Sequence, residues 1–150
     1  MGIWPDNPFL AQIPTWLIVV TGWYVVHRLT LKRDERKEAR ERVDVFLSLL
    51  RNIEDKAILF HQSEVFRGDI ARALRFDIQR AIGRLKRHPF AKFKIDPNLS
   101  RELRHAITYR NFEPSKFVTQ FEQSSILSDI ANAVDDIEEQ MEREYEKIYL

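Results

Sequence analysis

The chain has 150 residues, a net charge of +1, 31% charged residues, four glycines and no cysteine. The lack of cysteine excludes disulfides, thiolate metal sites and a cysteine nucleophile, and it fits a reducing compartment. Abundant charges with few glycines favour helices over turn-rich β structure, so an all-α fold is expected.

Residues 7–26, near the N-terminus, carry no charged side chain. About twenty apolar residues at roughly 1.5 Å rise each match a hydrocarbon core of roughly 30 Å. We therefore expect a short tail at residues 1–8 and an N-terminal transmembrane helix at residues 9–27. A signal peptide is disfavoured because residues 1–8 carry no Lys or Arg, and a buried core helix because the run lacks helical alternation of polar residues.

Residue types that prefer the membrane–water interface flank this span. They are Trp4, Trp23, Tyr24, Arg28, Lys32 and Arg33. Residues 28–42 carry seven Lys/Arg, whereas residues 1–8 carry none. The positive-inside rule then predicts a single-pass protein with its N-terminus outside and its C-terminal domain in the cytoplasm, with a bacterial inner membrane as the expected location.

Residues 28–42 alternate in charge sign and predict a charged, solvated helical stalk. Residues 43–150 predict a cytoplasmic helical bundle. Apolar residues from Val43 to Ile58 recur every three or four positions, so a helix is expected to end near residues 61–63. A second helix should stop at His88–Pro89, and Asp96–Pro97 should cap a short third one. A long last helix is expected from about Lys116 to the C-terminus.

Charge is unevenly distributed over this domain. Residues 67–94 hold nine Lys/Arg against two Asp, a net charge of +7, and residues 122–147 hold nine Asp/Glu against two Lys/Arg, a net charge of −7. The two segments are expected to attract each other, a partner, or the counterpart on another copy.

The basic helix contains the best candidate for a partner-binding surface, because an aromatic side chain lies among arginines. Its residues are Arg72, Arg75, Phe76, Arg80, Gly83 and Arg87. Arg72 and Arg80 are the i−4 and i+4 neighbours of Phe76 and are placed to stack on its ring. The alternative is that Phe76 packs on another element while the arginines extend to solvent.

The last helix carries a narrow apolar stripe with coiled-coil spacing, which is a candidate for self-association into a homo-oligomer. The stripe consists of Ile130, Val134, Ile137, Met141, Tyr145 and Ile148. The alternative is that this helix folds back onto the helix that begins at Val43 and completes a monomeric bundle.

The sequence holds no pattern typical of catalysis. The four histidines are scattered, and no metal-binding, phosphate-binding or nucleophile motif is present. We therefore expect no enzyme activity, cofactor, metal or small-molecule substrate, and two aspartates within the basic helix disfavour nucleic acid. The leading hypothesis is a membrane-tethered interaction or scaffolding module that docks a protein partner or self-associates. The alternative is a small membrane-active protein whose assembled spans perturb or perforate the bilayer, as in phage or defence proteins.

Overall fold

The computed structural model describes residues 8–109 and 111–150, with side chains described from Pro14 onward. The predicted N-terminal tail up to residue 7 and the interface residue Trp4 lie outside this part. The described residues form four α-helices and two 3-10 turns without a strand, which confirms the all-α prediction. The helices are α1 (Pro8–Gln62), α2 (Gly68–Leu85), α3 (Pro97–Thr108) and α4 (Ser125–Tyr149).

The long helix α1 contains the expected apolar span, the charged stalk and the first bundle helix without interruption. Every described side chain from Pro14 to Glu38 is exposed, and the first buried side chain is that of Ala39. Ala39 also begins the compact unit formed by residues 39–150. Of the described helices, none combines the length and the apolar character that a membrane crossing requires.

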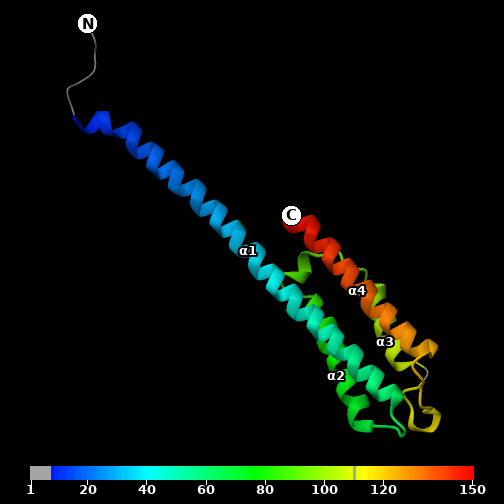
Figure 1. Ribbon diagram of the computed structural model, residues 1–150. Helices are drawn as coiled ribbons and strands as arrows, with labels where there is room; N and C mark the ends of the chain where they lie inside the picture. The colour runs from blue at the N-terminus through cyan, green and yellow to red at the C-terminus, as the bar shows by residue number, and fades with distance from the viewer. Residues whose placement is uncertain (1–7, 110) are drawn as a thin grey trace. The chain divides into compact units, whose positions relative to one another are not determined.

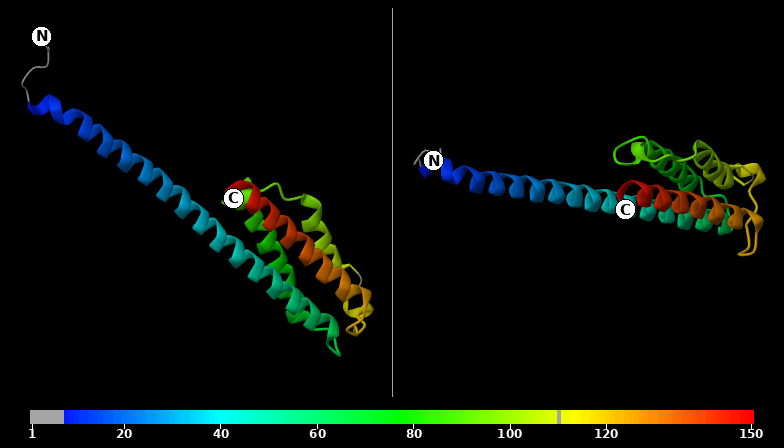
Figure 2. Two further views of the ribbon diagram at one scale, coloured as in Figure 1. Left: turned by 45° about the horizontal axis from the view of Figure 1, so that its top comes forward. Right: turned by 90° about the horizontal axis from the view of Figure 1, so that it is seen from above.

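The compact unit is a bundle in which α2, α3 and α4 lie along the part of α1 from Ala39 onward (Figures 1 and 2). Each helix contributes large side chains that are fully buried. These are Phe46, Leu50, Ile53, Phe60, Leu74, Ile78, Leu103, Ile107, Ile130, Ile137 and Met141. Their removal from water is the main force that holds the bundle together.

The predicted helix boundaries hold for the third helix, but the second helix ends at Leu85 rather than at His88–Pro89, and the last helix starts later than predicted. Asp96 caps α3, because its carboxylate accepts a hydrogen bond from the Asn98 amide at 2.9 Å, with proline at the first helical position as expected. The last helix begins at Ser125 rather than Lys116. The expected start is instead a short 3-10 turn, η2 (Pro114–Lys116), and an irregular segment follows it.

Tertiary hydrogen bonds explain why residues 117–124 stay out of the last helix. The Asn111 side chain accepts from the Val118 amide at 2.7 Å and donates to the Val118 carbonyl at 2.8 Å. The Gln120 amide donates to the His61 carbonyl at 2.8 Å. These backbone groups therefore have partners outside a helix, and Ser124 then caps α4 by accepting from the Leu127 amide.

His61 is fully buried beneath this segment. Its Nδ1 lies 3.1 Å from the Asn111 amide nitrogen, and its Nε2 lies 3.1 Å from the Ile107 carbonyl. The side-chain nitrogen of Asn111 can only donate a hydrogen bond. His61 Nδ1 therefore accepts, and His61 Nε2 carries the ring proton. Burial lowers the pKa of His61, which agrees with a neutral ring.

Ion pairs join α4 to α1. Glu142 lies 2.6 Å from Arg40, and Glu138 and Asp135 lie 2.5 and 3.2 Å from Arg51. Lys56 of α1 pairs in the same way with Asp77 of α2 at 2.7 Å. The carboxylates of Asp135, Glu138 and Glu142 thus pair with arginines of α1 and not with arginines of α2.

Candidate functional site

The outer face of α2 is where the structure gathers the predicted partner-binding residues. Ala71, Leu74, Ile78 and Ala81 are buried on one side of this helix. At about 100° per residue, the opposite side carries a strip about 80° wide. This outer strip of α2 consists of Arg72, Phe76, Arg80 and Gly83, and Arg87 follows the end of the helix at Leu85. The amphipathic pattern therefore places four of the six predicted residues on one strip, of which Arg72, Phe76 and Arg80 are exposed.

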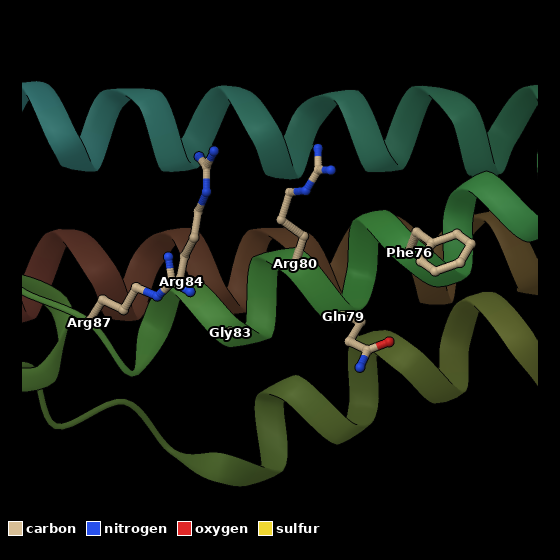
Figure 3. Close-up of a pocket in the computed structure, with 6 residues that line it drawn as sticks. All are labelled: Phe76, Gln79, Arg80, Gly83, Arg84 and Arg87. Atoms are coloured by element: carbon tan, nitrogen blue, oxygen red, sulfur yellow. The ribbon is translucent and has the colours of Figure 1, made fainter.

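A hollow of about 650 Å³ lies on this face. It is lined by Phe76, Gln79, Arg80, Gly83, Arg84 and Arg87. Figure 3 shows the guanidinium groups of Arg80 and Arg84 directed toward α1, while Gln79 points toward α3. Phe76 is 63% exposed, so the alternative in which it packs on another element is wrong.

The arginines of the hollow have no anionic partner within the described chain. Arg80, Arg84 and Arg87 make no ion pair or side-chain hydrogen bond there. The two acids of α2 are already paired with cations outside the hollow, Asp69 with Arg67 at 2.9 Å and Asp77 with Lys56 at 2.7 Å. The aspartates that interrupt the basic helix in sequence therefore do not neutralise this face.

The predicted stacking of arginines on Phe76 does not occur among the described residues. Instead, the Arg75 guanidinium lies 5.1 Å above the centre of the Phe112 ring. Arg75 helps to line a second hollow of about 430 Å³, together with Gln79, Arg104 and Thr108. Gln79 belongs to both hollows, so the two adjoin, and the second is also lined by Glu113, which pairs with Lys116 at 2.8 Å.

Seven residues that line the two hollows were absent from the predicted set, and Arg84, Gln79 and Arg104 are three of them. Arg84 follows Arg80 by four positions, so helical spacing alone predicts that the two are neighbours. Gln79 carries no charge and has no local signal. Arg104 belongs to α3, and only the tertiary structure brings it to the surface of α2.

The predicted self-association stripe of α4 is part of the core. The first five of its six residues are buried, and only Ile148 is partly exposed, at 40%. These side chains pack inside the chain's own bundle with the helix that contains Val43. The stripe therefore lies as the alternative predicts, with this helix folded back into the chain's own bundle.

The predicted interface residues of α1 are exposed. The Trp23 ring stacks on His27 with ring centroids 5.2 Å apart. Arg28 donates to the Tyr24 hydroxyl at 3.0 Å, and its guanidinium lies 5.5 Å from the centre of the Tyr24 ring. Lys32 and Arg33 are exposed as well. The cationic side chains of Arg28, Lys32 and Arg33 therefore follow Trp23 and Tyr24 along the same helix.

In the part of the chain that the structure describes, no group of three or more His, Cys, Asp or Glu residues is placed to hold a metal ion. Comparison with protein-family models, with curated proteins and with solved structures finds no match. The arginine-lined hollow of α2 and the exposed apolar part of α1 are therefore the features from which a function can be inferred.

Proposed function

We propose that this protein is a membrane-tethered helical interaction module. Residues 9–27 insert into the bilayer, and the outer face of α2 docks an acidic protein partner in the cytoplasm. The observation that carries the proposal is the hollow on α2, which is lined by an exposed phenylalanine and by three arginines that have no anionic partner among the described residues. Arginine and aromatic side chains are the residue types that dominate binding energy at protein interfaces.

The tether is supported by the apolar side chains of α1. Eleven large apolar side chains between Trp16 and Leu31 are exposed. Contiguous exposed apolar surface of this kind marks a site of membrane or protein contact. Lipid suits it best because the uncharged run also includes residues 7–13, and because the cationic residues that follow favour the cytoplasmic headgroups.

Carbonate extraction of membranes tests the tether. The full-length protein should remain in the membrane pellet, and Val20→Arg should shift it to the soluble fraction, because a central arginine opposes insertion by about 2.5–3.5 kcal/mol. Leu59→Arg is the matched control, since Leu59 is also exposed but lies in the compact unit. Release of the unmodified protein by carbonate would contradict the tether.

The docking surface is supported by charge and shape together. Two guanidinium groups project over the hollow, and the glycine at its floor leaves open space, because a Cβ added at Gly83 meets no atom within 4 Å. An acidic segment that buries a side chain against Phe76 satisfies both features. Burial of this kind also strengthens the arginine–carboxylate pairs relative to exposed ones.

Photo-crosslinking in cells tests the docking surface. A benzoylphenylalanine at Phe76 should give a discrete adduct, and Arg80→Glu with Arg87→Glu should abolish it. The same crosslinker at Phe121, which is 83% exposed and lies outside α2, is the control. Equal adducts from both positions, or an adduct at Phe76 that survives the arginine substitutions, would refute the proposal.

A further inference from the structure

The second hollow, of about 430 Å³, differs from the first in how it is built. The first is lined by residues of α2 and of the turn that follows it, whereas the second is lined by α2, α3 and the residues after α3. Ile78 and Phe112 line the second hollow and are only 1% and 5% exposed, so part of its wall is the apolar core of the bundle. Hollows of this size between bundle helices, with an apolar wall, are typical sites for small molecules.

The second hollow is also lined by guanidinium groups from two different helices. Arg75 belongs to α2, and its contact with the Phe112 ring, 5.1 Å from the ring centre, holds it beside the hollow. Arg104 belongs to α3, and its guanidinium makes no hydrogen bond or ion pair within the described chain. Gln79 points toward α3 (Figure 3) and adds an amide donor. The hollow therefore offers three donor groups to a bound anion, and two of them are cationic.

The carboxylate in the lining does not neutralise these arginines. Glu113 is exposed and pairs with Lys116 at 2.8 Å, not with Arg75 or Arg104. A carboxylate ligand supplies the missing anion, because its two oxygens accept from guanidinium donors in the planar geometry that both groups favour. A dianion such as phosphate fits less well, because Glu113 repels the second negative charge.

The space beside the arginines suits an apolar ligand body. A cavity of about 150 Å³ is large enough for one benzene ring, so about 430 Å³ has room for a carboxylate and one or two rings. We propose that this hollow binds a small monocarboxylate with an apolar body. The carboxylate binds Arg75 and Arg104, and the apolar body lies against the wall that Ile78 and Phe112 form. This small-molecule site is additional to the docking of a protein partner on the outer strip of α2.

Methyl NMR of the full-length protein in phosphatidylcholine nanodiscs, titrated with 2-naphthoate, tests the proposal. The δ1 methyl group of Ile78 reports on the hollow, and that of Ile148 on α4 controls for partitioning of the probe into lipid. The Ile78 signal should shift saturably with a dissociation constant below about 1 mM, while Ile148 stays unchanged. 2-Naphthamide keeps both rings but lacks the charge, so it should bind at least about tenfold more weakly.

Two arginine variants separate this site from a general effect of charge. Arg104→Gln should weaken binding of 2-naphthoate about tenfold or more, because a hydrogen bond between charged groups is lost. A circular dichroism spectrum that matches the unmodified protein shows that the variant is folded. Arg101→Gln is the matched control, since Arg101 is exposed on α3 but does not line the hollow, and it should leave the affinity unchanged.

Three results would overturn the proposal. They are equal affinities for 2-naphthoate and 2-naphthamide, an unchanged affinity in Arg104→Gln, and the lack of a saturable shift at Ile78. The α-amide of N-acetylglutamate, which resembles an acidic side chain without an apolar body, should bind at least about tenfold more weakly than 2-naphthoate. Equal binding of these two probes would reject a small-molecule site and assign the hollow to an acidic side chain of a protein.

Discussion

Ile137→Ala should destabilise the bundle strongly, because Ile137 is only 2% exposed and packs in the core formed by all four helices. The substitution removes three carbon groups, at about 0.8 kcal/mol for each buried methylene, or about 2.4 kcal/mol of transfer free energy. The cavity that remains adds to this, so the free energy of unfolding should fall by about 3–4 kcal/mol. A loss of this size is a large fraction of the about 5–15 kcal/mol typical of a domain.

Urea unfolding of the full-length protein in mild detergent, followed by circular dichroism, measures this loss. With a slope of about 1–3 kcal/mol per molar urea, the midpoint should fall by about 1–4 M. Ile148→Ala is the matched control from the same stripe, and it should change the free energy of unfolding by less than about 1 kcal/mol because Ile148 is 40% exposed. Unchanged stability of Ile137→Ala, with loss of an oligomer, would show that the stripe is an intermolecular seam after all.

Three further substitutions test individual contacts. The pKa of His61 is lowered below its ordinary value of 6.5, so the unfolded state takes up a proton before the folded state does. Stability should therefore fall as the pH drops below about 6.5 toward the lower pKa of the folded state. His61→Gln should flatten this part of the plot of melting temperature against pH. A plot unchanged by the substitution would contradict the assignment. Asp96→Ala should lower the free energy of unfolding, measured in urea, by about 1 kcal/mol because the α3 cap is lost. A decrease no larger than that caused by Asp69→Ala, which caps no helix, would argue against the cap. Gly83→Ala should raise the free energy of unfolding by about 0.5–1 kcal/mol, because its Cβ meets no atom within 4 Å and alanine favours the helix; a lower melting temperature would refute this.

The sequence predicts those parts of the fold that depend on local chemistry. The cap at Asp96 with proline at the first helical position is a local pattern, and α3 begins there. The stripe from Val43 onward predicts a buried helix face, and Val43, Phe46 and Leu50 are buried. The residues of the outer strip of α2 share one face because a helix repeats every 3.6 residues.

The remaining features depend on contacts between residues distant in sequence. Asn111 and His61 hold residues 117–124 in an irregular path, and nothing in the sequence of that segment indicates that its backbone finds partners 50 or more positions away. A narrow apolar stripe on α4 fits a core helix and a coiled-coil seam equally well, so its spacing alone could not assign it. The pairing of Arg40 with Glu142 likewise spans 102 positions.

The central claim is that the outer strip of α2 is the surface through which the tethered protein binds its partner. A scan of photo-crosslinker positions in intact membranes tests it most directly. Adduct yield should be high at Arg72, Phe76 and Gly83, which share the strip, and at background level at Phe121 and Tyr109, which are exposed on other parts of the bundle. Uniform yields at all five positions, or a maximum away from α2, would contradict the claim.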